Sequence, residues 1–307
     1  MKILLTGASG LFGRSLMVHL AALAGSPDAL IGTARSRIAP PLQQLDLTDE
    51  PAVRAAFARW APDLVVHSAA ERRPDVVDGE PAVAERLNVG ASELLARLAA
   101  ARGARFIYIS TDYVFDGMSP PYATDAKTAP LNAYGRMKLA GEEAVRAAYS
   151  DSAVGENAFA ILRIPILYGR VESLAESPVT ELAARLLDGH AFKVEDWAMR
   201  YPAHADDVAR AVTVVAEPLT QGLPVGGTYH FAGSEQITKY GMALVIAKDL
   251  GVDTRLVQAD PNPPSGAPRP KDCRLDASRL LALGFAPRIR FADGVHDALA
   301  PFRGVRS

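Results

Sequence analysis

Ile3-Leu4-Leu5-Thr6-Gly7-Ala8-Ser9-Gly10-Leu11-Phe12-Gly13 is the stretch that decides the fold. Its apolar start predicts a β-strand, and a helical pattern follows from about Leu11 to Leu23. The glycines between them let the backbone approach a pyrophosphate, and a helix N-terminus offers free N–H groups and a partial positive charge. A glycine triplet alone is a weak signal, but this one has the strand–turn–helix context that the motif requires. The residues expected to bind phosphate are Gly7, Ser9, Gly10, Leu11, Phe12 and Gly13.

Short apolar runs alternate with helical patterns through the first half of the chain. The further strand candidates are Ala29–Thr33, Asp63–His67, Phe106–Ser110 and Phe159–Arg163. The helix candidates begin near Pro51 and cover about Ala82–Ala101 and Ala133–Tyr149. Strands separated by helices indicate parallel βαβ units, and uninterrupted apolar strands indicate a sheet that is covered on both faces. The prediction is an α/β fold with a doubly wound parallel sheet of the Rossmann type, whose ligand crevice lies at the carboxyl ends of the strands.

The pattern changes after about Tyr168, where Gly and Pro become frequent, as in Pro218–Gly227 and Pro261–Pro270. Such turns suit the walls of a substrate pocket better than they suit helices. We therefore expect residues 1–164 to form the dinucleotide-binding domain and residues 165–307 to form mainly a smaller substrate-binding lobe. Some segments of the second part, such as Thr228–Phe231, are candidates to return to the main sheet.

Composition excludes several classes of function. The 307 residues carry a formal net charge of −2 without a Lys/Arg run, so no nucleic acid partner is expected. No stretch approaches the ~18 apolar residues of a spanning helix, and no membrane association is expected. The first residues are too short an apolar run for a signal peptide, and the single Cys273 allows no internal disulfide, so we expect a cytoplasmic protein. No metal is expected, because His204 has no partner at metal-ligand spacing.

The choice of cofactor depends on the end of the second strand. Dinucleotide-binding folds usually place a carboxylate there to hold the ribose 2′-hydroxyl. Here the sequence reads Arg35-Ser36-Arg37, and guanidinium groups suit the 2′-phosphate of NADP(H), although a pair of solvated arginines is the alternative. Asp46-Leu47 ends another apolar run, where the acid is a candidate either to bond the adenine amino group or to cap the following turn.

The candidate catalytic residues follow the Phe106–Ser110 strand. Thr111 stands at the rim of the predicted crevice, and Tyr134 and Lys138 lie on one face of the next helix. Of the nine tyrosines, only Tyr134 has a lysine four residues on. A nearby ammonium is expected to lower the pKa of the phenol from its usual ~10 and make it a proton donor to a carbonyl near neutral pH. The Thr111 hydroxyl can hold the same carbonyl oxygen.

Together these motifs resemble the extended short-chain dehydrogenase/reductases. More narrowly, Gly-x-x-Gly-x-x-Gly, Asn88 in Leu-Asn-Val, Ser-Thr-Asp-Tyr-Val-Phe and Tyr-x-x-x-Lys resemble the dTDP-4-dehydrorhamnose reductase family. The resemblance implies that Tyr134 is the acid/base, that Thr111 orients the carbonyl, that Lys138 binds the nicotinamide ribose and that Asn88 supports a proton relay. It also implies a homodimer and a nucleotide-sugar substrate. The predicted cofactor set also contains Ser68, Ala69, Ala70, Arg72 and Leu167, and the predicted substrate set is Asp112 and Arg269.

Alternatives remain open for two of these arginines. Arg72, with Arg73 beside it, is a candidate for the cofactor or for a substrate diphosphate, or is simply solvated. Arg269 is a candidate for a nucleotide diphosphate or for a structural ion pair.

Several segments depart from the sugar reductases. Arg163–Gly169 and Arg200–Asp207 replace that family's Arg-Thr-Ser-Trp-Val-Tyr and Gln-x-Gly-x-Pro-Thr patterns. Together with Ala70–Asp75 and Glu235–Tyr240, they resemble the regulatory beta subunits of methionine adenosyltransferase, which bind NADP and serve a partner enzyme. Two hypotheses follow: an NADPH-dependent ketone reductase, or a regulatory subunit with a methionine adenosyltransferase partner. A 4,6-dehydratase is disfavoured, because Tyr113 stands where those enzymes carry Glu.

Overall fold

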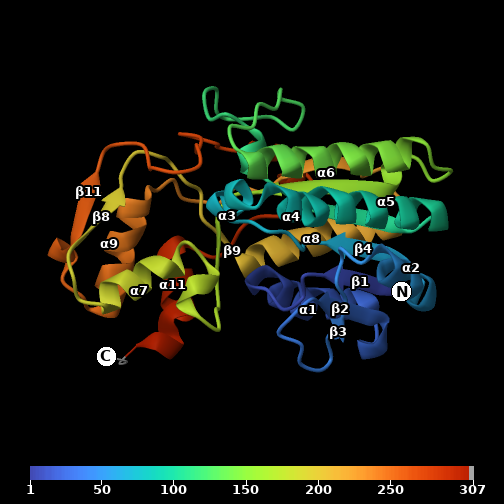
Figure 1. Cartoon of the computed structure of the whole chain (residues 1–307), viewed down its shortest axis with the longest axis horizontal. Coiled ribbons are helices and arrows are strands. Elements are labelled where there is room, and N and C mark those ends of the chain that lie inside the picture. Colours follow the sequence, from blue (N-terminus) through green and yellow to red (C-terminus); the bar gives the residue numbers. More distant parts are fainter. Residues whose placement is uncertain (304–307) are drawn as a thin grey trace.

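A seven-stranded parallel sheet organises the chain, whose computed structural model describes residues 1–303. The strand order is β10-β6-β5-β4-β1-β2-β3. Figure 1 labels β1, β2, β3 and β4 of this sheet. The strands are β1 (Ile3–Thr6), β2 (Leu30–Ala34), β3 (Gln43–Gln44), β4 (Leu64–His67), β5 (Arg105–Thr111), β6 (Phe159–Ile164) and β10 (Gly227–His230). All neighbouring pairs are parallel, which confirms the predicted doubly wound fold.

Helices cover both faces of this sheet. One face packs against α1 (Leu11–Ala24) and α8 (Ala205–Thr220), and the other packs against α2 (Glu50–Trp60), α5 (Ala91–Arg102) and α6 (Ala133–Ser150). Because side chains alternate along a strand, Ile3 and Leu5 enter the first core while Leu4 enters the second. This double burial is why the strands read as continuous apolar runs.

A smaller lobe lies beside the sheet and has a core of its own. It contains α7 (Thr180–Leu187), α9 (Lys239–Leu250), α11 (Phe291–Leu299) and two small sheets, β8 (Phe192–Glu195) with β11 (Val257–Asp260) and β7 (Leu167–Tyr168) with β9 (Ala203–His204). Between lobe segments the chain returns to the main sheet, where α8 packs on α1 and β10 pairs with β6. Residues 304–307 of the predicted lobe lie outside the described residues.

The helix predicted over about Ala82–Ala101 is present, and within it one turn is π-helical instead of α-helical. The structure has α3 (Pro74–Gly79) and α4 (Pro81–Glu85), and then a π-helical turn, Arg86–Gly90, before α5. A π-turn holds one extra residue and often lies at a functional site.

Membrane-spanning helices and metal-binding clusters were sought among the residues that the structure describes. Within residues 1–303 no helix is both long and apolar enough to cross a bilayer. The same range holds no group of three or more His, Cys, Asp or Glu side chains placed to bind a metal ion. Cys273 is buried, and burial raises the pKa of its thiol, in agreement with a structural role.

Gly13→Ala tests how tightly the turn between β1 and α1 is packed. A Cβ at this position would lie 2.0 Å from the Gly7 carbonyl oxygen and 2.6 Å from the Ala8 Cα. Because both atoms are backbone, the turn itself has to move, and we expect the free energy of unfolding to fall by about 1–3 kcal/mol in urea denaturation.

Gly90→Ala is the matched control, since its Cβ meets nothing within 4 Å. Alanine is favoured over glycine in helices by about 1 kcal/mol, so this variant should be neutral or more stable. Equal destabilisation of the two variants would contradict the packing argument.

Candidate active site

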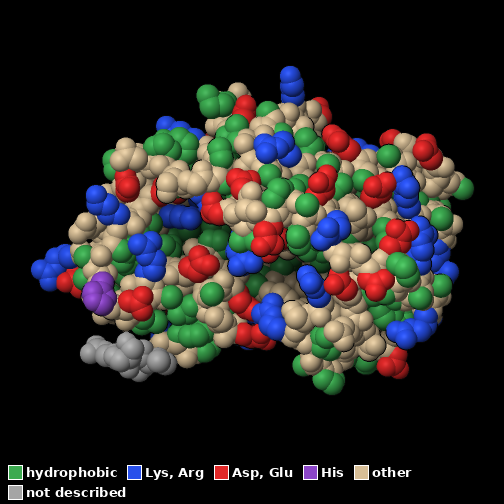
Figure 2. Space-filling view, viewed as in Figure 1, with side chains coloured by type: hydrophobic (Ala, Val, Ile, Leu, Met, Phe, Trp, Pro, Cys, Tyr) green, Lys and Arg blue, Asp and Glu red, His purple; other side chains and the backbone are tan. Residues whose placement is uncertain are grey.

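A cavity of about 670 Å³ lies between the carboxyl ends of the strands and the smaller lobe. The molecular surface is hollowed near the middle of Figure 2, and both basic and acidic side chains surround the hollow. Of the residues predicted from the sequence, Asn88 alone does not line this cavity. The predicted residues that line it are Gly7, Ser9, Gly10, Leu11, Phe12, Gly13, Arg35, Ser36, Arg37, Asp46, Leu47, Ser68, Ala69, Ala70, Arg72, Thr111, Asp112, Tyr134, Lys138, Leu167 and Arg269.

The glycine-rich turn forms one end of the cavity. Gly7 has a φ of +74°, and a Cβ there would lie 3.0 Å from the backbone of Ala69. Gly10 is the N-cap of α1, and no side chain caps the first turn of that helix. The turn therefore leaves room and free N–H groups for an anion. These residues fit a dinucleotide, whose pyrophosphate the turn would hold.

The arginines after β2 already have carboxylate partners. Arg35 Nε lies 3.2 Å from Asp46 Oδ2, and Arg37 donates to Glu176 of the smaller lobe. Asp46 also accepts from the Thr48 backbone N–H at 2.9 Å, so it caps the following turn, and the Thr48 hydrogen bonds lower its pKa. Sequence reasoning missed Glu176, because it lies 139 residues from Arg37.

Three elements bring the candidate catalytic groups together. Thr111 ends β5, and its hydroxyl donates to Asp112 Oδ1 at 3.1 Å. Tyr134 lies in the first turn of α6, which Asn132 caps by accepting from the Gly135 N–H at 2.8 Å. The ring of Tyr113 meets that of Tyr134 edge to face, with 6.2 Å between their centroids. Thr111 and Tyr134 therefore face the same cavity, as the sequence predicted.

The predicted fall in the Tyr134 pKa was wrong. Burial raises the pKa of Tyr134 and the Asp112 carboxylate adds to the rise, while the Thr111 hydroxyl opposes it. The Lys138 ammonium lies 3.9 Å from the centre of the Tyr108 ring, and burial lowers the pKa of Lys138 to about 7, with Glu142 opposing. Desolvation dominates here, and sequence spacing gives no measure of it.

Asn88 lies in the π-helical turn and is 1% exposed. Its Oδ1 accepts from the Glu71 N–H at 2.9 Å, and its Nδ2 donates to the Glu71 carbonyl at 3.0 Å. The side chain thus fixes the loop that follows β4 and carries Arg72. The proton-relay role implied by resemblance stays a prediction.

The opposite end of the cavity is lined by cations from distant segments. Arg269 makes an ion pair of 2.7 Å with Asp75, which is the structural alternative left open by the sequence. Arg200 is 4% exposed and Lys239 begins α9, and both line the cavity. Neither was among the predicted site residues, although both belong to segments whose departure from the sugar reductases was seen in the sequence, Arg200–Asp207 and Glu235–Tyr240.

Comparison with known proteins places this geometry in a family. Residues 1–303 match the family described as the RmlD substrate binding domain. The chain belongs to this family. The result confirms the predicted resemblance to dTDP-4-dehydrorhamnose reductases.

Two kinds of known protein are similar to the chain in sequence: a regulatory subunit and a reductase. Methionine adenosyltransferase 2 subunit beta of Mus musculus is 41% identical over 303 residues, which cover 98% of this chain and 88% of that protein. dTDP-4-dehydrorhamnose reductase of Mycolicibacterium smegmatis is 32% identical over 308 residues, which cover 99% and 86%. Both likenesses expected from the sequence are therefore confirmed.

Solved structures of the family share the fold. A dTDP-4-dehydrorhamnose reductase from Clostridium acetobutylicum superposes with a TM-score of 0.82 at 27% identity, over 98% of this chain and 99% of that one. The reductase from Bacillus anthracis, solved in complex with NADP, gives a TM-score of 0.79 at 24% identity, over 98% and 99%.

Asp112 gives the site a measurable pH dependence. Burial raises the pKa of Asp112 from 3.8 to about 6, against the influence of Arg200. A carboxyl group whose folded-state pKa is raised destabilises the fold increasingly as pH rises from about 4 to about 6. Asp112→Asn removes this penalty and keeps an oxygen for the Thr111 hydroxyl. We expect its free energy of unfolding to exceed that of the wild type by ~2–3 kcal/mol at pH 7.

Urea denaturation at pH 4, 5, 6 and 7 measures this difference, which should approach zero at pH 4. Asp125→Asn, at an exposed position, controls for the loss of one charge. A difference for Asp112→Asn that stays constant across the range would contradict the argument.

Proposed function

We propose that the chain is an NADP(H)-dependent reductase of a ketone on a nucleotide-linked deoxysugar. One observation carries the proposal: the phosphate-binding turn and the groups Thr111, Tyr134 and Lys138 line a single cavity. A dinucleotide extended from the turn along the strand ends would place its nicotinamide end toward these groups. NADPH would supply the hydride.

Each side chain has a distinct role in the proposed reduction. Tyr134 donates its phenolic proton to the carbonyl oxygen of the substrate, and its raised pKa keeps that proton in place near neutral pH. The Thr111 hydroxyl donates a hydrogen bond to the same oxygen and orients it. The Lys138 ammonium holds the nicotinamide ribose. In the free site Asp112 Oδ1 accepts the single hydroxyl hydrogen of Thr111, and this hydrogen turns from Asp112 to the substrate oxygen when a ketone binds.

The charge at the far end of the cavity supports a phosphorylated substrate. Arg200, Lys239 and Arg269 line this end, and each supplies N–H donors of the kind that bind phosphate oxygens. The likeness to dTDP-4-dehydrorhamnose reductases supports the same substrate class. The departures at 163–169 and 200–207 distinguish this chain from those reductases at positions where sugar contacts are expected.

Reduction of nucleotide-sugar ketones tests the proposal directly. Purified protein with NADPH should consume at least one member of a panel that includes dTDP-4-dehydrorhamnose, at ~1 s⁻¹ or faster. The loss of NADPH absorbance measures the rate. Absence of turnover across the panel, in protein that binds NADPH, would overturn the reductase assignment.

Tyr134→Phe separates the proton donor from the rest of the site. The variant should fold and bind NADPH like the wild type, because only the hydroxyl is lost. Its turnover on the best panel substrate should fall by ~10²-fold or more, which is the usual contribution of a positioned acid. Tyr240→Phe, on α9 where the ring packs against the core of the smaller lobe, is the control and should keep full turnover. Unchanged turnover in Tyr134→Phe would show that another group supplies the proton.

A second candidate function is regulation of a methionine adenosyltransferase as its beta subunit. The 41% identity to such a subunit over nearly the whole chain supports it. Light scattering coupled to size exclusion, with and without the methionine adenosyltransferase of the same organism, tests it. A stable mixed complex without reductase turnover would favour this function. The same run with the chain alone tests the expected homodimer.

A further inference from the structure

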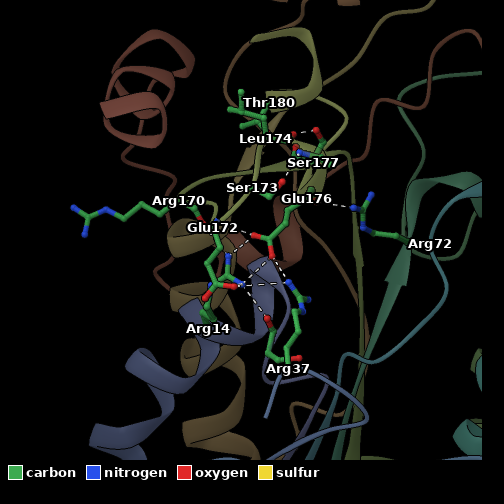
Figure 3. A network of polar contacts seen from close by, with 12 residues as sticks. Arg14, Arg37, Arg72, Arg170, Glu172, Ser173, Leu174, Glu176, Ser177 and Thr180 are labelled. Carbon is green, nitrogen blue, oxygen red and sulfur yellow. Dashed lines mark hydrogen bonds and ion pairs between the residues drawn. The ribbon is translucent and has the colours of Figure 1, made fainter. Parts of the chain in front are cut away.

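Glu176 lies at the centre of a polar network that joins the smaller lobe to the dinucleotide-binding half (Figure 3). Its Oε2 accepts from Arg14 Nη2 at 2.5 Å and from the Glu172 backbone N–H at 3.1 Å. Its Oε1 accepts from Arg14 Nη1 at 3.2 Å and from Arg37 Nη1. The Glu176 carbonyl accepts from Arg72 Nη2 at 2.5 Å. One acidic residue of the lobe thus engages three arginines of the other half.

The three arginines come from three separate segments that follow strands at the carboxyl edge of the sheet. Arg14 belongs to the first turn of α1, Arg37 follows β2, and Arg72 follows β4. Glu176 belongs to the short segment 172–177 between β7 and α7. Glu176, Arg37 and Arg72 all line the cavity, so the network spans the proposed cofactor site.

The two arginines that hold the carboxylate differ in exposure and in other partners. The Arg14 side chain is 27% exposed, and its guanidinium also donates to the carbonyls of Ser9 at 2.9 Å and Arg170 at 3.3 Å. The Arg37 side chain is 53% exposed, and its hydrogen bond to the lobe goes to Glu176. Arg14 is therefore fixed, whereas Arg37 is free to turn toward another anion without leaving Glu176 unpaired.

We propose that Glu176 limits the preference for NADP(H) over NAD(H) by competing with the 2′-phosphate of NADP(H) for Arg37. The inference rests on the proposed NADP(H) site. A carboxylate and a phosphate monoester bind the same N–H groups of a guanidinium. Only the phosphorylated cofactor has to displace Glu176 from Arg37, so Glu176 lowers affinity for NADPH and leaves affinity for NADH unchanged. The hydrogen bonds from Arg14 and Glu172 lower the pKa of Glu176 to about 2, so the competition persists across the physiological pH range.

Calorimetric titration of NADPH and NADH into wild type and Glu176→Gln tests the competition. The wild type should bind NADPH at least about tenfold tighter than NADH, because charge-assisted hydrogen bonds are individually worth such a factor. Glu176→Gln keeps an acceptor for Arg14 but weakens the hold on Arg37. We expect it to bind NADPH about fivefold to tenfold tighter than the wild type does, with NADH affinity changed less than about twofold.

Glu172→Gln is the matched control in the same segment. Glu172 is 63% exposed and its carboxylate lies 3.5 Å from Arg14 and 3.8 Å from Arg37, so its removal should change either affinity less than about twofold. If Glu176 instead held Arg37 ready for the phosphate, Glu176→Gln would weaken NADPH binding. That result would overturn the proposal, and so would an unchanged NADPH affinity.

A double-mutant cycle with Arg37→Ala shows whether Glu176 acts through Arg37. In the Arg37→Ala background, Glu176→Gln should no longer tighten NADPH binding. An equal gain in both backgrounds would mean direct repulsion between the carboxylate and the phosphate and would overturn the sharing of Arg37. A wild type that binds neither cofactor would contradict the proposed function itself, and that outcome is recognised before any variant is made.

Hydrogen exchange of the wild type gives a readout without mutation. Backbone amides of residues 172–177 should exchange faster in the NADPH complex than in the NADH complex, because only the 2′-phosphate draws Arg37 away from the segment. Slower exchange with NADPH would contradict the proposal.

Discussion

The close approach of backbone to backbone in the turn between β1 and α1 is the constraint on which the site depends. Gly13 packs against the Gly7 carbonyl, and Gly7 in turn leaves no room for a side chain beside Ala69. This packing holds the N-terminus of α1 over the end of β1, where its free N–H groups face the cavity. Because the strands are parallel, the same edge also receives the residues that follow β2, β4 and β5. One local packing requirement therefore decides where the arginines and the candidate catalytic groups can meet.

A buried ion cluster beneath the cavity fixes the candidate catalytic helix. Glu142, one turn after Lys138, is fully buried and accepts from Arg163 at 2.9 and 2.7 Å and from the Ser110 hydroxyl at 2.6 Å. These contacts tie α6 to the ends of β5 and β6. Gly141 lets the helix approach so closely that a Cβ there would lie 2.1 Å from the Tyr108 hydroxyl. The same approach buries Lys138 against the Tyr108 ring, and burial in turn lowers the pKa of this lysine.

Much of the dinucleotide-binding half could be predicted from the sequence. Five strands agree with expectation to within about one residue at most ends, because strands buried on both faces are continuously apolar. The strand-end positions of Thr111 and Arg37 followed from the same pattern. The sequence did not place Glu176, Arg200 and Lys239 in the site. These residues enter the cavity from the smaller lobe, and no periodic pattern in the sequence shows how that lobe packs against the sheet. The direction of the Tyr134 pKa shift was also missed, since it depends on how deeply the folded chain buries the phenol.

Transfer of deuterium from labelled cofactor tests the central claim most directly. NADPH carrying deuterium at the reactive nicotinamide carbon would be incubated with the protein and a nucleotide-linked 4-ketosugar, and the product would be analysed by mass spectrometry. The account predicts one deuterium in the product, on the carbon that was the carbonyl. If the protein binds NADPH in this cavity and yet no deuterium reaches any product, the cavity does not serve reduction of these ketones and the reductase account is contradicted.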